Sequence, residues 1–170
     1  ASGVIFRGNE KDSFDSYEDS NGSKVFMNLD NIYRIYENGL LEYRYIPGYE
    51  GAERGSVSSA FVIAAQFVNR VRSSLNPGTD IYISGISEQA QFYEFAFDYM
   101  QGDVPVYIDE GPQGESAQPV RNAIVVRANG RRMLECRWML KSIETEAGPG
   151  SYNLSHEYLL DASGLSSGSV

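Results

Sequence analysis

The chain has 170 residues, with 14 Lys and Arg against 23 Asp and Glu, a formal net charge of −9 and 42% hydrophobic residues. A chain of this length can bury one sizeable hydrophobic core, so we expect a single domain over residues 1–161 and a flexible tail over residues 162–170. The acidic balance argues against a nucleic acid as partner, because binding to phosphates needs a basic surface, and it disfavours electrostatic docking to anionic lipid.

Cysteine and histidine each occur once, as Cys136 and His156. A single cysteine excludes an internal disulfide and a thiolate-rich metal site, and a single histidine excludes the paired-histidine zinc motifs. We therefore expect no metal and no cofactor. Cys136 shares its expected strand face with Leu134 and Trp138, which predicts a buried thiol that packs as a small hydrophobic group.

The N-terminal part combines a polar segment with a β-hairpin. Residues 8–24 are polar and poor in aliphatic side chains, which predicts a loop. Residues 31–37 and 40–46 are rich in Ile, Tyr and Leu, and Asn38-Gly39 lies between them. Because Asn-Gly suits the two positive-φ positions of a type I′ turn, we expect two antiparallel strands joined by a two-residue turn.

Residues 56–75 have the hydrophobic period of an α-helix. Ser56 or Ser58 can cap its N-terminus, and Asn76-Pro77-Gly78 ends it. The apolar residues expected to form one buried stripe are Val57, Phe61, Ala64, Ala65, Val68, Val71 and Leu75. A helix that is apolar on one side needs a sheet to pack against.

The second half of the chain supplies strands for that sheet. We expect strands over residues 80–86, 91–100, 104–108, 120–127 and 132–143. In the strand 91–100, aromatic residues at every second position predict one buried face, made of Tyr93, Phe95, Phe97 and Tyr99. Pro105 predicts that its strand lies at an edge of the sheet or begins there.

The remaining segments complete the predicted fold. Residues 109–118 contain glycines and a proline and are expected to form a loop, whereas Asn129-Gly130 joins the last two strands in a second hairpin. Ser155 is expected to cap a helix over residues 156–161. The predicted fold class is α+β: an antiparallel, meandering β-sheet packed against one long helix (about 56–75), with a short C-terminal helix.

The chain lacks the motifs of common catalytic sites: a phosphate-binding loop, a dinucleotide-binding glycine motif and a nucleophile elbow. We therefore expect no catalytic residues. A hydrolase with paired carboxylates stays open as an alternative, based on Glu94 or Asp98. These two are about 13 Å apart along one strand, which is too far for either geometry of glycoside hydrolysis. A neighbouring strand would have to supply the partner, such as Glu42 or Glu135.

Twelve tyrosines are many for this length. Packing against a sheet accounts for such residues, but exposed tyrosines can also stack on sugars or contact protein partners. The alternative function is therefore a cell-wall polysaccharide-binding module that uses exposed tyrosines. Tyr49 is the most suggestive of contact, because its loop is rich in glycine. The candidate interaction surface consists of Tyr49, Phe92, Glu94 and Asp98.

The order of strand and turn residues resembles that of the extracytoplasmic domains of the YycH/YycI regulatory proteins of Gram-positive bacteria. The resemblance covers residues 32–161, most of the chain. Its landmarks are Tyr33-x-x-Tyr36-x-Asn38-Gly39-x-x-Glu42-Tyr43, the helix 56–75, Gly85-Ile86, Tyr93-x-Phe95-x-Phe97-Asp98-Tyr99-x-x-Gly102-Asp103-Val104-Pro105-Val106, Ala123-Ile124-x-Val126, Asn129-Gly130-Arg131 and Arg137. They form a loose pattern and contain no catalytic signature.

The resemblance implies a regulator that is not an enzyme. Proteins of that family resemble membrane-anchored accessory proteins with one N-terminal transmembrane helix and a domain outside the cell. They associate with each other and with the sensor histidine kinase of the cell-wall two-component system. The expected partners are therefore that kinase or a paralogous regulator, and a homodimer is a further option. We expect the extracytoplasmic face of the membrane as location, through an anchor helix that this chain lacks.

Overall fold

The computed structural model describes residues 14–48, 53–75, 80–108, 110–112, 119–120 and 122–141. The expected C-terminal helix over residues 156–161, the tail and Tyr49 lie outside these residues. Within them, the fold is α+β, with one helix and a largely antiparallel β-structure. The helix is α1 (Val57–Leu75). The strands are β1 (Asp15–Glu18), β2 (Lys24–Met27), β3 (Asn31–Ile35), β4 (Leu40–Tyr45), β5 (Asp80–Glu88), β6 (Tyr93–Gln101), β7 (Val104–Val106), β8 (Glu110–Pro112), β9 (Pro119–Val120), β10 (Ile124–Ala128) and β11 (Met133–Met139).

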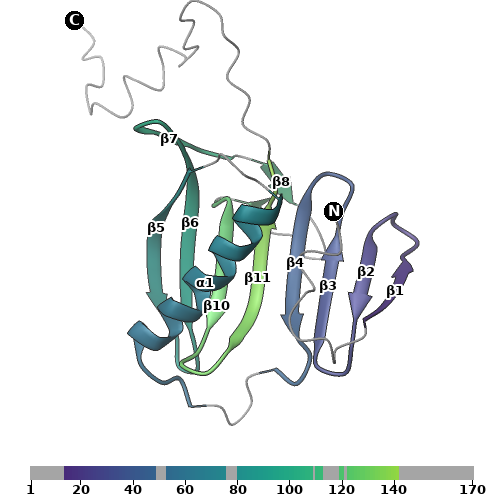
Figure 1. Cartoon of the computed structure of the whole chain (residues 1–170), viewed down its shortest axis with the longest axis horizontal. Coiled ribbons are helices and arrows are strands. Elements are labelled where there is room, and N and C mark those ends of the chain that lie inside the picture. The colour runs from purple at the N-terminus through teal and green to yellow at the C-terminus, as the bar shows by residue number, and fades with distance from the viewer. Residues whose placement is uncertain are drawn as a thin grey trace, which may run out of the picture.

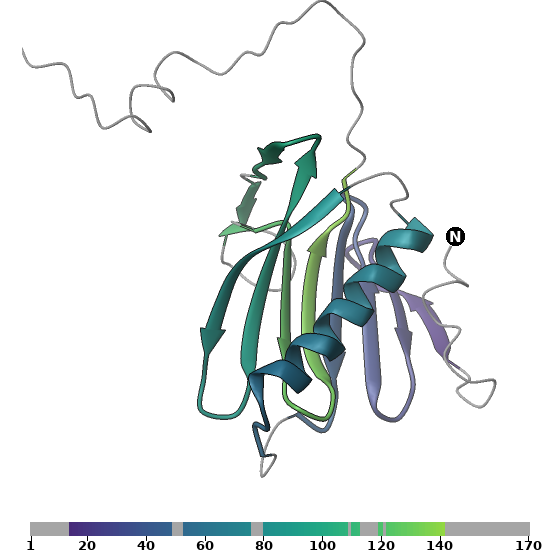
Figure 2. The ribbon, with the colours of Figure 1, turned by 60° about the vertical axis from the view of Figure 1, so that its left-hand side comes forward.

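Nine strands form one antiparallel sheet, and α1 lies across one of its faces (Figures 1 and 2). The strand order is β1-β2-β3-β4-β11-β10-β6-β5, and β7 pairs with the far end of β6. The two remaining strands, β8 and β9, form a separate pair. Because β8 begins at Glu110, it corrects the expectation of a loop over residues 109–118.

The sheet is a meander only at its N-terminal edge, from β1 to β4. The helix then carries the chain to the opposite edge, where β5 and β6 form, and the hairpin β10–β11 closes the gap between β6 and β4. This corrects the expectation of a simple meander. Residue alternation predicts which face a side chain occupies, but it carries no information about which strands are neighbours.

The helix begins as expected, because the backbone N–H of Ser59 donates to Ser56 Oγ at 3.1 Å. Its buried residues are Ala60, Ala64, Phe67, Val68 and Val71. The buried stripe of the helix is therefore rotated relative to the predicted one, since Val57 and Phe61 are 41% and 36% exposed. The physical reason is the position of α1, which contacts β10, β6 and β11, so the side of the helix that faces the outermost strand β5 is less covered.

Strand β6 supplies the centre of the core. Its aromatic residues Tyr93, Phe95, Phe97 and Tyr99 are all buried, as predicted. The Tyr99 hydroxyl donates to the carbonyl oxygen of Met139 at 2.7 Å and accepts from Trp138 Nε1, also at 2.7 Å. Since Tyr99 and Trp138 are fully buried, this hydroxyl satisfies two polar groups that water does not reach.

The hairpin β1–β2 corrects the expectation of a loop over residues 8–24, of which residues 14–24 are described. All four side chains of β1 are exposed, so no buried face creates the alternation that marks a strand. β1 is a strand because its backbone pairs with β2, and the polarity of its side chains gives no indication of this pairing. The dipeptide Asn21-Gly22 was an available signal, because it is the same turn dipeptide as Asn38-Gly39.

The Asn38-Gly39 turn joins β3 and β4 as expected, but it differs from the expected two-residue type. Ile35 pairs with Leu41, and the N–H of Gly39 donates to Tyr36 O at 3.1 Å, so three residues form the turn. Gly39 takes the left-handed conformation (φ 90°), and the N–H of Leu40 donates to Asn38 Oδ1. Glycine is therefore required after a type I turn, rather than within a type I′ turn.

The second hairpin forms as expected between β10 and β11, but its two turn residues are Gly130 and Arg131 rather than Asn129 and Gly130, because the N–H of Asn129 donates to Arg132 O at 3.0 Å. Asn129 is 1% exposed, and its Oδ1 accepts from the backbone N–H groups of Arg131 and Arg132, both at 2.9 Å. The asparagine thus precedes the tip of the turn. Gly130 has another role: its N–H donates to Arg54 O at 2.7 Å, which ties this hairpin to the segment that enters α1.

Cys136 lies on the buried face of β11 and is 2% exposed, as expected from its position. Burial raises the pKa of its thiol above the ordinary value of 9.0. The native protein should therefore react with a thiol reagent only at the rate at which the chain opens.

We predict that a disulfide reagent labels Cys136 slowly in buffer and rapidly in denaturant. The same burial predicts a pH dependence, since the unfolded thiol ionises above about pH 9 and the folded one does not. The protonated, buried thiol therefore contributes fully to the free energy of unfolding below about pH 9, and this contribution is lost as the pH rises further. Immediate labelling of the native protein would contradict the buried position.

Candidate functional site

The candidate site is the face of the sheet opposite α1, which no helix of the described residues covers (Figure 2). Charged side chains of alternating sign follow one another across neighbouring strands in register. We call them the charge ladder. Its first row is Glu94, Arg127, Glu135 and Arg44, and its second row is Arg137, Glu42 and Arg34. Opposite charges on directly paired residues stabilise a sheet and fix its register.

Arg127 is the centre of the first row. Its Nε lies 2.8 Å from Glu94 Oε2 and its Nη1 lies 2.8 Å from Glu135 Oε2. Its guanidinium also lies over the ring of Phe92, 5.5 Å from the ring centroid. Partial burial lowers the pKa of Arg127, but the hydrogen bond to Glu94 and the charges of both carboxylates raise it by more. Arg127 therefore holds the carboxylates of Glu94 on β6 and Glu135 on β11 in fixed positions.

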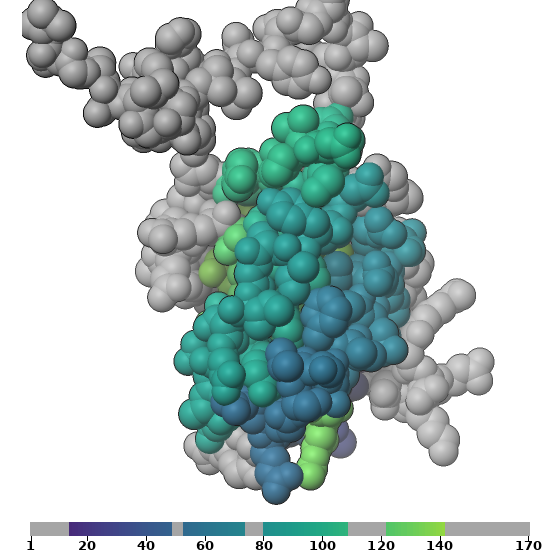
Figure 3. Space-filling view, turned by 90° about the vertical axis from the view of Figure 1, so that its left-hand side faces the viewer, coloured from purple at the N-terminus to yellow at the C-terminus, as the bar shows by residue number. Residues whose placement is uncertain are grey.

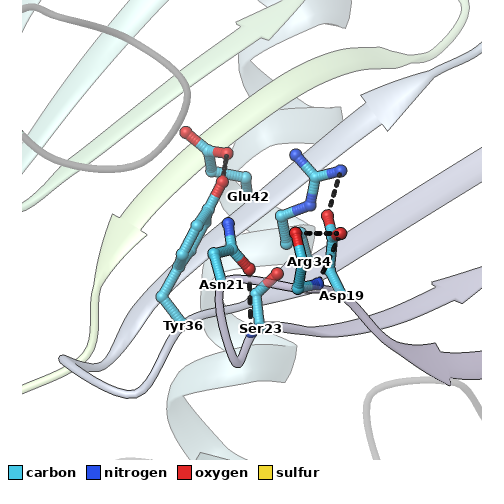
Figure 4. A network of polar contacts seen from close by, with 7 residues as sticks. Asp19, Asn21, Ser23, Arg34, Tyr36 and Glu42 are labelled. Carbon is cyan, nitrogen blue, oxygen red and sulfur yellow. Dashed lines mark hydrogen bonds and ion pairs between the residues drawn. The ribbon is translucent and has the colours of Figure 1, made fainter.

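The second row continues the ladder toward the N-terminal hairpin. Arg137 Nε lies 3.5 Å from Glu42 Oε1, and the Tyr36 hydroxyl donates to Glu42 Oε2 at 2.8 Å. Arg34 Nη2 lies 3.6 Å from Asp19 Oδ2, in the turn between β1 and β2 (Figure 4). Burial, followed by the hydrogen bond to Glu42, raises the pKa of Tyr36. Charges from β11, β4, β3 and the first turn are thus ordered in one surface.

The structure brings two of the predicted surface residues together. Phe92 and Glu94 both contact Arg127. Asp98 does not belong to this surface, because it is 2% exposed. Its Oδ1 accepts from the N–H of Ala123 at 2.8 Å and its Oδ2 from Asn122 Nδ2 at 2.9 Å. Asp98 therefore fixes the entry into β10 and does not offer its carboxylate to a partner.

The arginines of the ladder were missing from the sequence-based surface. Arg127, Arg137 and Arg44 each stand at a strand position opposite to the buried ones. The alternation of polar and apolar residues in the sequence predicts this polar face. Their pairing with carboxylates depends on the neighbours β10–β6 and β11–β4, which alternation does not reveal.

The carboxylates considered for hydrolysis occupy other roles. Glu94 and Glu135 share Arg127 as their ion-pair partner, while Asp98 is bound within the fold. Glu42 is likewise paired with Arg137 and bound by Tyr36. Among the described residues, no group of three His, Cys, Asp or Glu side chains is arranged to hold a metal ion.

Some of the described tyrosines are buried in the core and others are exposed. Tyr33, Tyr43, Tyr93 and Tyr99 belong to the core. Tyr17 and Tyr107 are 49% and 70% exposed, but Tyr17 is in β1 and Tyr107 follows β7, strands that are not neighbours in the sheet. These two exposed tyrosines therefore form no common platform, although Tyr107 lies within hydrogen-bond reach of the half-buried Tyr82 of β5.

Comparison of the chain with family models, curated proteins and solved structures finds no match. The one helix of the described part, α1, is not apolar enough to cross a bilayer.

Proposed function

We propose that this chain is a non-enzymatic extracytoplasmic regulatory domain that modulates a sensor histidine kinase of a two-component system by protein–protein interaction. The proposal takes the kind of partner from the resemblance to YycH/YycI-type regulators. It takes the binding surface from the charge ladder. A paralogous regulator is the second expected partner of the same surface.

The observation that carries the proposal is the order of the charges on the open face. Ion pairs and strand pairing fix seven charged side chains in alternating sign before any partner arrives. A partner with the opposite pattern gains attraction at each position, whereas a wrong partner or a shifted register meets like charges. Such a surface favours specificity and fast association more than raw affinity.

We expect the protein to co-purify with the extracytoplasmic segment of the kinase and Arg44→Glu to weaken this association about tenfold or more. Arg44 is an exposed member of the ladder, so reversing its charge changes the surface and leaves the core intact. The measurement is an equilibrium pull-down with purified kinase segment at low ionic strength.

Arg131→Glu is the matched control. Arg131 is 69% exposed and lies near Glu53 in a turn outside the ladder, so its reversal should leave the association unchanged. Equal losses for both variants would assign the effect to net charge alone. No association of the wild-type protein with the kinase segment would overturn the proposed function.

A further inference from the structure

The strand β5 forms one edge of the sheet, and its outer side has no partner strand among the described residues. It has nine residues, which is long for an exposed edge. The opposite edge, β1, has four residues and carries an acidic side chain at each end, Asp15 and Glu18. Short, charged edges resist pairing with other chains, whereas long edges with apolar side chains favour it. β5 also has an acidic residue at each end, Asp80 and Glu88, so the two edges differ in length and in the number of apolar side chains between those ends.

A β-bulge gives β5 an unusual distribution of side chains. Opposite β6, Ile83 pairs with Phe97 and Gly85 with Ala96, so Ser84 is an extra residue. The extra residue reverses the alternation after Ile83. As a result Ile86 faces the same side as Ile83, the side of the helix, and pairs with Phe95.

Ile81 and Ile83 form one wall of a groove between β5 and α1, which lie side by side in Figure 3. The groove has a volume of about 200 Å³, and Phe61 and Ala65 of the helix line its other wall. Ile83 is 40% exposed and Ile86, just beyond the groove, is 58% exposed. Within the described part of the chain, the outer edge of β5 thus offers backbone groups without a strand partner beside an exposed apolar strip.

We propose that this edge pairs with β5 of a second copy of the chain, in antiparallel register about a two-fold axis. Opposite residues of an antiparallel pair share a face, and the bulge therefore restricts the possible registers. Placing Ile83 opposite Ile86 of the second copy satisfies this condition and occurs twice by symmetry. Four isoleucines then form one apolar cluster, and Phe61 of each copy covers it from the helix side.

The placement of charges along β5 permits a second copy as occupant. The acidic residues of β5, Asp80 and Glu88, stand at its two ends, 3.8 Å from Arg72 and 2.6 Å from Arg54 respectively. In the proposed register Glu88 faces Ile81, and Asp80 faces the uncharged residue after Glu88. No like charges therefore face each other across the new pair. The uncharged centre of the strand meets the same uncharged centre in the other copy.

Sedimentation velocity over a wide range of protein concentration tests this inference. We expect a reversible monomer–dimer equilibrium that salt strengthens, because each copy carries a net charge of −9 and the copies repel each other at low ionic strength. Ile86→Lys should raise the dimer dissociation constant at least about tenfold. The control is Val62→Lys, since Val62 is 51% exposed and does not line the groove.

These experiments test dimerisation through β5 and do not depend on whether the protein binds a kinase. A wild-type protein that stays monomeric at every concentration and salt would overturn the inference, and it would leave the edge to a strand of another protein. A dimer that Ile86→Lys leaves intact, or that Val62→Lys disrupts equally, would also overturn it. Amide hydrogen exchange in β5 should slow in the dimer, and unchanged exchange there would place the interface elsewhere.

Discussion

Tyr99→Phe should lower the free energy of unfolding by about 3 kcal/mol, although it removes a single oxygen atom. That oxygen accepts from Trp138 Nε1 and donates to Met139 O, both at 2.7 Å. Without it, a buried indole N–H and a backbone carbonyl lose a partner at the same time. The cost of a buried polar group without a partner exceeds the gain from a typical hydrogen bond, because water cannot replace the lost contact.

Urea unfolding followed by tryptophan fluorescence measures this loss directly. Trp138 is the single tryptophan of the chain and is fully buried in the core, so its emission reports unfolding of the sheet. Tyr17→Phe is the matched control, since Tyr17 is 49% exposed. A loss for Tyr99→Phe no larger than that for the control would contradict the role assigned to the buried hydroxyl.

Gly55→Ala is expected to cost about 3 kcal/mol or more, for two separate reasons. Gly55 has a φ of 70°, a left-handed conformation that disfavours a side chain. An added Cβ would also lie 2.8 Å from the Cα of Gly130, which is backbone and cannot rotate away. The contact joins the entry of α1 to the β10–β11 turn, so relief of the clash would shift the helix on the sheet.

Two further substitutions separate these causes. Gly102 also has a positive φ, but nothing lies within 4 Å of its added Cβ, so Gly102→Ala should cost only about 1 kcal/mol of conformational strain. Gly130 lacks a positive φ, yet its Cβ would lie 3.0 Å from Gly55 Cα, so Gly130→Ala reports the clash alone. Equal losses for Gly55→Ala and Gly102→Ala, measured by the same urea unfolding, would show that the close approach of the two backbones is unimportant.

The sequence predicted the parts of the fold that depend on local periodicity. The aromatic alternation from Tyr93 to Tyr99 predicted the buried face of β6, and Ser56 predicted the start of the helix. It did not reveal β1, whose side chains are all exposed. The rotation of the helix stripe was also hidden, because the exposure of Phe61 depends on where α1 lies on the sheet.

The surface was predicted less completely than the core, and for a physical reason. Phe92 and Glu94 could be chosen from one strand, but Arg127 gives them a shared role from a neighbouring strand that is distant in sequence. Asp98 had the right alternation for the same face, yet it is bound to the backbone of Ala123. Alternation separates the two faces of a strand, whereas the burial of Asp98 depends on its hydrogen bonds to Asn122 and Ala123, which precede β10.

We propose that this domain binds a kinase through the ordered charges of the ladder. Calorimetric titration of the wild-type protein with the kinase's extracytoplasmic segment, at low and at high salt, separates this proposal from its alternatives in one experiment. We expect saturable binding at low salt that becomes weaker as salt screens the ladder. If binding is absent at low salt, or if its affinity does not depend on salt, the ladder is not the binding surface.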